Sequence, residues 1–171
     1  MVRVEGRHRK RRPPERVLGW REWTGLPDFG VRAIKAKLDT GARTSALHAF
    51  GIRSLVRDGI DMVRFEIHPI QRSSAASVEV VVPMIDRRVV RNSGGGAEDR
   101  PVIETTLQIG EELWPIELTL TRRDEMGFRM LLGREALRDR AVVDAGSSFR
   151  AGRHAIGRRS TTPTAKEDEE E

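Results

Sequence analysis

Short blocks of alternating apolar and polar residues recur through the middle of the chain, and turn-forming residues bound each block. They span residues 62–67, 77–82, 102–109 and 114–120 and are rich in Val, Ile, Leu, Thr and Trp. Alternation with a period of two predicts β-strands. The middle of the chain is therefore predicted to be mainly β.

Two further strands are predicted nearer the N-terminus. Residues 17–23 form an apolar-rich block that ends at a turn over residues 24–27. Residues 31–38 form the second, which leads directly into Asp39. This order places an acidic side chain at the end of a predicted strand.

Glycines mark the connections between the later elements. Gly110 separates two alternating blocks and predicts a hairpin between them. One helix is predicted after Gly133, because residues 134–138 are Arg, Glu, Ala, Leu and Arg, which are good helix formers. The fold class is thus mainly β with one short C-terminal helix.

The composition indicates one compact domain. The chain has 171 residues, 37% of them hydrophobic, and no cysteine, which excludes disulfides, thiolate metal sites and a catalytic thiol. No stretch approaches 18 consecutive apolar residues, and no apolar segment follows the basic N-terminus. We therefore expect a cytoplasmic protein with no membrane partner.

Charge is concentrated at the two ends of the chain. Residues 1–16 contain seven Lys or Arg, and residues 151–171 end in the acidic run 167–171. We expect a disordered basic arm over 1–16, a folded domain over 17–150 and a disordered tail over 151–171. The arm has two interpretations, a solvated extension or a segment that binds nucleic acid or the ribosome.

The run Asp39-Thr40-Gly41 places an acid on a glycine turn. Thr40 and Gly41 let the backbone turn tightly and present the carboxylate outward, as aspartic peptidases present their catalytic acid. All three are also common turn residues, so the run alone is compatible with an ordinary surface turn. A second run, Asp144-Ala145-Gly146, follows the predicted helix and is predicted to be an ordinary turn.

A second sequence element favours a catalytic interpretation of the acid turn. Leu131-Leu132-Gly133 precedes the helix, and an acid turn early with an apolar-apolar-glycine segment late resembles the retropepsins. Longer blocks, at 18–23, 34–48, 100–103 and 121–134, resemble the bacterial retropepsin-like family catalogued as "ATP-dependent zinc protease". The likeness covers roughly residues 17–150 and neither end of the chain.

The resemblance implies a fold, an assembly and partners. The fold would be a single-lobe closed β-barrel that forms a two-fold homodimer, in which Asp39 of each copy shares a proton with the other. Members of the family are associated with an ATP-grasp ligase that adds glutamates to a ribosomal protein. We therefore expect a functional link to such a ligase.

The resemblance also implies residue roles. Asp39 would activate water while Thr40 and Gly41 hold the turn, and Leu131, Leu132 and Gly133 would lie beneath it. A glycine-rich hairpin would close over the substrate, unless its loop is simply disordered. The residues expected to bind substrate are Ala42, Arg43, Gly94, Gly95 and Arg134.

Arg43 is a departure from the retropepsins, which usually carry an acid at this position that pairs with the arginine after the late glycine. A cation here predicts a positive cleft that attracts acidic peptides. The other cations that could contribute, or that could be solvated strand-edge charges, are Lys35, Lys37, Arg122, Arg123 and Arg129.

The catalogue name mentions zinc and ATP, but the sequence contains neither a zinc-peptidase motif nor a P-loop motif for ATP. The four histidines, His8, His48, His68 and His154, have no His-Glu-x-x-His spacing, and no Gly-Lys-Ser or Gly-Lys-Thr loop is present. No metal or cofactor is predicted, and His48 and His68 are expected to have structural roles.

The function predicted from the sequence is that of an aspartic-type peptidase acting on an acidic peptide or a glutamylated ribosomal protein. Two alternatives stay open at this point. One is a non-catalytic barrel module that binds ribosomes or RNA through its basic arm. The other is a zinc-dependent peptidase, as the catalogue name states.

Overall fold

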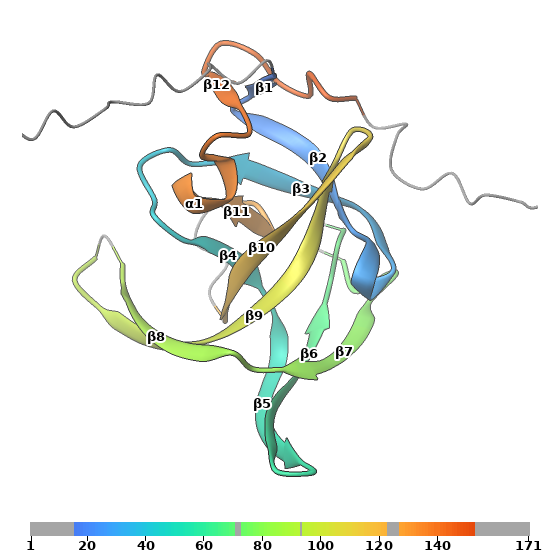
Figure 1. The fold of residues 1–171 in the computed structure, drawn as a ribbon, viewed down its shortest axis with the longest axis vertical. Helices are drawn as coiled ribbons and strands as arrows, with labels where there is room; N and C mark the ends of the chain where they lie inside the picture. Colours follow the sequence, from blue (N-terminus) through green and yellow to red (C-terminus); the bar gives the residue numbers. More distant parts are fainter. Residues whose placement is uncertain (1–15, 71–72, 93, 123–126, 153–171) are drawn as a thin grey trace, which may run out of the picture.

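The structure, a computed structural model, describes residues 16–70, 73–92, 94–122 and 127–152 (Figure 1). The predicted mainly β class with one short helix is confirmed. The basic arm and the acidic tail fall almost wholly outside the described residues. The elements are β1 (Val17–Gly19), β2 (Arg21–Leu26), the 3-10 helix η1 (Pro27–Phe29), β3 (Val31–Leu38), β4 (Ser45–His48), β5 (Phe50–Arg57), β6 (Ile60–Ile67), β7 (Val78–Pro83), β8 (Asp86–Arg91), β9 (Ala97–Ile109), β10 (Glu112–Thr121), β11 (Met130–Leu132), α1 (Arg134–Leu137) and β12 (Val142–Asp144).

The strands and the helix that the pattern predicts are present. β3 covers the predicted residues 31–38, and β6, β7, β9 and β10 overlap the four alternating blocks. β9 and β10 form the predicted hairpin, with Ile109 opposite Glu112 and Gly110 at a φ of 59°. Glycine adopts this left-handed conformation without steric cost. α1 is a single turn after Gly133, as expected.

Other elements differ from the prediction. The turn expected over residues 24–27 begins later, because Thr24 and Gly25 remain in β2 and the chain turns in η1. The pattern does not predict β4, β5, β8 or β12. β5 and β8 expose most of their residues and so lack a clear alternation, whereas β4 and β12 have only four and three residues.

The largest sheet places the end of β3 beside β11. Its strand order is β10-β4-β11-β3-β2-β9-β8, and β9 also pairs with β10. β11 runs parallel to β3 and antiparallel to β4, so Leu132 lies opposite Leu38 and Met130 opposite Leu47. β2 and β9 share one register pair, Gly25 with Gln108. The seven strands thus form one sheet in which β9 pairs with both β2 and β10, and the closed barrel stays a prediction.

A second sheet, β5-β6-β7, extends away from the first and shares its core (Figure 1). Phe65 of β6 meets Phe29 of η1 edge to face, with ring centroids 6.1 Å apart. Trp114 Nε1 donates to the carbonyl of Ala136 over 3.0 Å and anchors α1 on β10. None of the described helices has the length and apolar character needed to cross a membrane.

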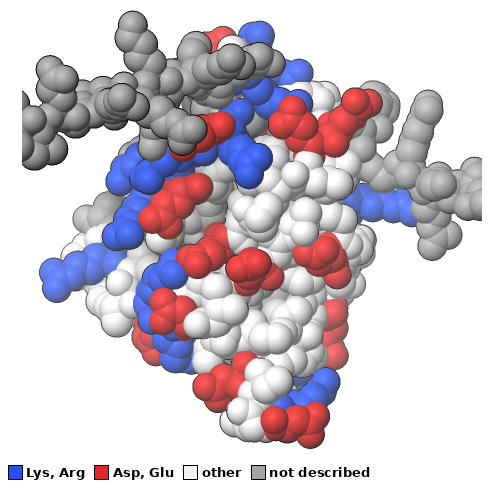
Figure 2. Space-filling model, in the orientation of Figure 1, with Lys and Arg blue, Asp and Glu red and all other residues white. Residues whose placement is uncertain are grey.

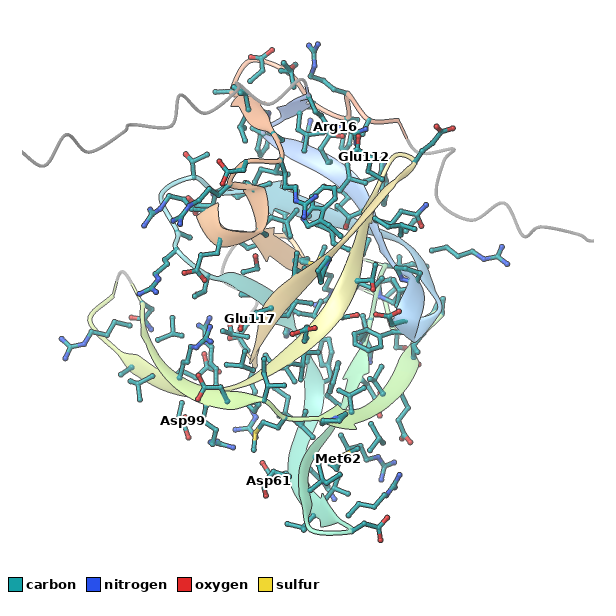
Figure 3. The ribbon with its side chains drawn as sticks, viewed as in Figure 1. Arg16, Asp61, Met62, Asp99, Glu112 and Glu117 are labelled. Carbon is teal, nitrogen blue, oxygen red and sulfur yellow. The ribbon has the colours of Figure 1, made fainter. Side chains whose placement is uncertain are left out.

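The two ends of the described domain are tied together. β1 pairs in parallel with β12. The fully buried carboxylate of Glu22 accepts hydrogen bonds from the N–H groups of Gly19, Arg150 and Ala151, which satisfies a charge that is costly to bury alone. Arg16 pairs with Glu112 at the β9–β10 hairpin (Figure 3). The first and last described segments are thus fixed by contacts within the same chain.

Candidate active site

Asp39 lies at the end of β3, on a turn that the neighbouring strand β11 holds in place. Its N–H donates to the carbonyl of Leu132 over 2.8 Å. Its Oδ1 accepts hydrogen bonds from the N–H groups of Gly41 (2.9 Å) and Ala42 (3.2 Å), while Thr40 is exposed beside it. Among the described residues, nothing donates to Oδ2. The turn therefore fixes one carboxylate oxygen and leaves the other without a hydrogen bond from the described residues.

Gly133 lies directly against the loop that follows the acid turn. A Cβ on Gly133 would be 2.5 Å from the carbonyl oxygen of Thr44 and 2.8 Å from that of Arg43, distances that real side chains do not adopt. Its N–H donates to Ser45 Oγ over 3.0 Å. Leu131 and Leu132, which precede it, are both buried. Close packing of two backbones is the reason that glycine is required here.

The start of α1 and the acid loop satisfy each other's backbone groups. The N–H of Arg134 donates to the carbonyl of Ala42 over 2.8 Å, and the N–H of Glu135 donates to that of Arg43 over 3.1 Å. The first N–H groups of a helix have no acceptor within the helix, so these bonds satisfy them. α1 is too short to be stable alone and depends on this contact.

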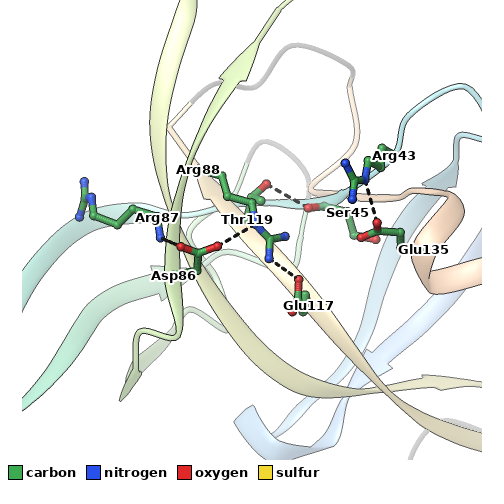
Figure 4. Close-up of polar contacts among 8 residues, drawn as sticks. All are labelled: Arg43, Ser45, Asp86, Arg87, Arg88, Glu117, Thr119 and Glu135. Atoms are coloured by element: carbon green, nitrogen blue, oxygen red, sulfur yellow. Dashed lines mark hydrogen bonds and ion pairs between the residues drawn. The ribbon is translucent and has the colours of Figure 1, made fainter.

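The two arginines expected to bind substrate make different contacts. Arg134 Nη1 donates to the carbonyl oxygens of Thr40 (3.1 Å) and Gly41 (2.9 Å), so it braces the acid turn. Arg43 Nε donates to Glu135 Oε1 over 2.8 Å (Figure 4), and this bond holds the pKa of the Glu135 carboxyl below its ordinary value. The Arg43 side chain is still 77% exposed.

A cleft of about 480 Å³ opens beside the acid turn. The predicted site residues that line it are Asp39, Gly41, Ala42, Arg43 and Leu131. Thr40, Leu132, Gly133 and Arg134 do not line it; they support the turn or the core beneath it. The structure thus brings the acid, its loop and an open space together.

Arginines dominate the charge of this cleft. Arg43, Arg91, Arg100 and Arg129 line it with Asp39, the only carboxylate among the described lining residues. Figure 2 shows Lys and Arg gathered along the flank that carries α1 and the β8 hairpin, while scattered Asp and Glu lie over β9 and β10. A positive cleft beside one acid attracts anionic groups.

Only some of the cations that the sequence offers for a positive cleft line it, Arg43 among them. Arg129 lines it, whereas Lys35, Lys37 and Arg122 do not. Lys35 lies over the Trp23 ring, and Arg122 Nη2 donates to the carbonyl of Ile52. Arg123 is outside the described residues. The sequence does not indicate that Arg91 and Arg100 line the cleft. Their position there depends on the pairing of β8 with β9, which no local sequence pattern predicts.

The glycine-rich hairpin joins β8 to β9 and reaches the cleft through residues before its glycines. Val90, Arg91 and Asn92 line the cleft, whereas Gly94 and Gly95 do not. The loop is closed by Asn92, whose Oδ1 accepts from the N–H of Gly96 (2.8 Å), and Gly95 has a φ of 84°. Gly94 and Gly95 therefore form the turn at the tip, while the residues before them line the same cleft as Asp39.

The histidines take part in stacking and pairing. His48 Nδ1 lies 2.8 Å from Arg129 Nη1, and His68 Nε2 lies 3.2 Å from Glu66 Oε2. The His68 ring stacks on Phe50 at a centroid distance of 3.9 Å, and the His48 ring contacts Phe50 at 4.4 Å with a tilt of 33°. Within the described part of the chain, no group of three or more His, Asp or Glu side chains is arranged to hold a metal ion.

Known proteins resemble this chain over most of the described domain. It is 47% identical over 130 residues to a probable alpha-L-glutamate ligase of Desulfotalea psychrophila, covering 76% of this chain and 28% of that protein. It is 48% identical over 136 residues to a protein of the same name from Shewanella halifaxensis, covering 80% of this chain and 30% of the relative. The chain thus spans less than a third of the length of these curated relatives.

A solved structure and a family profile extend the comparison. A crystal structure of a Legionella pneumophila protein of unknown function (DUF785) matches with a TM-score of 0.67 and 26% identity, covering 80% of this chain and 98% of that one. The profile described as RimB-like, retropepsin-like aspartic endopeptidase RimB, matches residues 17–154, which include the acid turn and the Leu131-Leu132-Gly133 segment. The chain therefore belongs to the RimB-like family of retropepsin-like aspartic endopeptidases.

Proposed function

We propose that this chain is an aspartic-type peptidase that hydrolyses peptide bonds in acidic substrates. The observation that carries the proposal is the geometry of Asp39. One carboxylate oxygen is engaged by the turn, the other accepts no hydrogen bond from the described residues, and both belong to a residue that lines an arginine-rich cleft. Membership of the RimB-like family supports the same chemistry.

The reaction requires two carboxylates. One takes a proton from the attacking water while the other donates a hydrogen bond to the scissile carbonyl oxygen, and the proton then passes to the leaving amine. One copy supplies one acid turn of this kind, so we propose a two-fold homodimer with Asp39 of both copies facing each other. The pair would titrate as a unit, because two adjacent carboxylates resist simultaneous ionisation.

The proposal includes the closed barrel of a single lobe. Pairing of β9 with both β10 and β2 supports it, since these contacts link the two ends of the order β10-β4-β11-β3-β2-β9. The β8–β9 hairpin would then close over a peptide in the cleft, with Val90, Arg91 and Asn92 nearest to it.

The proposed substrate is a glutamate-rich peptide, such as the glutamate tail of a modified ribosomal protein. Relatives named probable alpha-L-glutamate ligase support a link with glutamate ligation, and most of their length lies outside the part that matches this chain. The arginines of the cleft support an anionic substrate. In this proposal the chain removes what a partner ligase adds.

The test is mass spectrometry of a glutamylated ribosomal protein after incubation with the wild-type chain or with Asp39→Asn. Loss of glutamates with the wild type alone supports the proposal. Cleavage that survives in Asp39→Asn, or that stops with a chelator and returns with Zn²⁺, contradicts it. An equilibrium sedimentation run on the same samples measures the dimer, and a monomer that is fully active would rule out the shared dyad.

A further inference from the structure

One end of the cleft is built from strand ends that the topology brings together. Thr121 at the end of β10 lies opposite His48 at the end of β4, in the parallel pair of these strands. Arg129 immediately precedes β11, which runs antiparallel to β4. The N–H of His48 donates to the carbonyl of Arg129 over 2.8 Å. All three residues line the cleft.

Arg129 is buried and held in a defined orientation. It is 6% exposed, and its Nη1 lies 2.8 Å from His48 Nδ1. A guanidinium only donates hydrogen bonds, so Nδ1 of His48 accepts here and the ring keeps its proton on Nε2. The guanidinium carbon also lies 5.1 Å from the centre of the Phe50 ring, a cation–π distance. These contacts keep a positive charge at the cleft wall.

Arg100 adds a second buried guanidinium to the same end. It is 8% exposed, and its Nε donates to Glu98 Oε2 over 2.8 Å. Glu98 Oε2 also accepts from Thr121 Oγ1 (2.9 Å), and Oε1 accepts from the N–H of Arg122 (3.1 Å). Burial raises the pKa of the Glu98 carboxyl, but these hydrogen bonds outweigh it, and the net shift is downward. Glu98 therefore remains ionised and positions Arg100.

The strand register sets the distance between this end and the acid. The N–H of Asp39 donates a hydrogen bond to the carbonyl of Leu132, and Arg129 lies three residues before Leu132 in the chain. Three residues of extended chain span about 10 Å. An extended peptide with its scissile bond at Asp39 thus places a side chain two or three residues away beside Arg129. The cations are buried, so a hydrogen bond to a carboxylate is stronger there than at exposed Arg43.

We propose that Arg129, positioned by His48, and Arg100 form a carboxylate-binding subsite. It receives a carboxylate of the peptide two or three residues from the scissile bond. The carboxylate is either that of an acidic side chain or that of the chain terminus. The identification of the scissile bond rests on the proposed peptidase function, whereas binding of the carboxylate can be measured without cleavage.

The experiment uses a set of fluorescent peptides in which one Glu is moved along an all-Gln background. Each peptide is made with a free C-terminus and with a C-terminal amide. Binding is measured by anisotropy on full-length Asp39→Asn, and cleavage by mass spectrometry on the wild type. We expect one Glu position to bind roughly 10- to 100-fold more tightly than the all-Gln peptide, as for a charged hydrogen bond in a buried site. If the preference is retained in the amidated peptides, the subsite binds the Glu side chain. If the preference is lost in them, the subsite binds the terminal carboxylate.

Arg129→Gln and Arg100→Gln, made in the same background, should reduce the ratio of single-Glu to all-Gln affinity at that position. Arg122→Gln is the matched control, because Arg122 is exposed and does not line the cleft. Arg129→Lys keeps the charge without the planar fork, and should retain part of the preference. It also replaces Arg129→Gln if circular dichroism shows that the latter is unfolded.

Two results would overturn the subsite. One is equal binding of every single-Glu peptide and the all-Gln peptide. The other is a preference that Arg122→Gln reduces as much as Arg100→Gln and the Arg129 variants do. A positional binding preference without any cleavage by the wild type would support the subsite and contradict the peptidase function, so the two failures are distinguishable.

Discussion

Two turns in this molecule have nearly the same local structure and different surroundings. Asp39-Thr40-Gly41 follows β3, and Asp144-Ala145-Gly146 begins at the last residue of β12. In each, Oδ1 of the aspartate accepts the N–H of the glycine two residues later, over 2.9 Å. Short-range hydrogen bonding of this kind is common to aspartate turns and carries no information about catalysis.

The second oxygen of each aspartate separates the two turns. Asp144 Oδ2 accepts from Ser147 Oγ over 2.6 Å and lies 3.7 Å from Arg150 Nη1, and these contacts hold the pKa of the Asp144 carboxyl below its ordinary value. Asp39 Oδ2 has no such partner among the described residues, and Asp39 lines the cleft. Asp144 thus has partners at both oxygens, whereas Asp39 keeps one oxygen without a partner among the described residues, as the proposed reaction requires.

The largest expected effect comes from exchanging each aspartate for its amide. Asp39→Asn should lower kcat/KM for a glutamate-rich peptide by roughly 10²- to 10⁴-fold, because the amide cannot take a proton from water. Asp144→Asn should change kcat/KM by no more than about twofold, as a surface substitution does. Steady-state kinetics on both variants measures this. Equal losses would show that the two turns do not differ in role.

The glycines associated with the two turns should differ in what they tolerate. Gly133→Ala places a Cβ 2.5 Å from the backbone oxygen of Thr44, and we expect it to destabilise the fold by about 1–3 kcal/mol. Gly146→Ala meets only Asp144 Oδ1, at 3.4 Å, and should cost less than about 1 kcal/mol. Urea unfolding of both variants provides the comparison. A Gly133→Ala variant as stable as the wild type would contradict the close backbone packing.

The arginines next to the two turns offer a finer comparison. Arg134→Gln removes both bonds to the carbonyls of Thr40 and Gly41, and should lower kcat roughly tenfold with little change in KM. Arg150→Gln, beside Asp144, should leave both constants unchanged. Should Arg134→Gln instead raise KM at constant kcat, Arg134 binds substrate and does not position the turn.

The smallest expected effect concerns acid stability. The pKa of the Glu135 carboxyl is lowered by its bond to Arg43, so Glu135 stabilises the fold above the unfolded pKa of about 4.3, and the contribution is lost as pH falls through the folded value. The pair is exposed, so screening limits the effect to roughly 0.5 kcal/mol. Glu135→Gln should have a slightly lower Tm than the wild type at pH 7 and the same Tm near pH 3. A difference that grows on acidification would have the wrong sign.

The strands that could be predicted are those with one fully buried face. β3, β6, β9 and β10 alternate because every second side chain enters the core, and the period is visible in the sequence. β8 lies at the edge of its sheet and carries Arg87, Arg88 and Arg91, whose charges remove the alternation. Its place follows from pairing with β9, which no local pattern encodes.

The candidate site divides in the same way. The acid turn and Leu131-Leu132-Gly133 could be singled out because each is a continuous run with a conformational requirement. Arg91 and Arg100 could not, since each is one of many arginines and only the β8–β9 pairing brings them to the cleft. The contacts of Arg134 with the acid turn could not be predicted either, because its carbonyl acceptors belong to residues more than 90 positions away.

By itself, the sequence determined the mainly β class, the turn that displays Asp39, the glycine before the helix and the resemblance to the retropepsins. These depend on side-chain period and on local backbone conformation, which neighbouring residues control. The tertiary structure alone decided which of two similar aspartate turns faces a cleft, which arginines line that cleft and which of them are buried. Those properties depend on strand pairing between distant segments, and a contact across such a distance leaves no periodic trace in the chain.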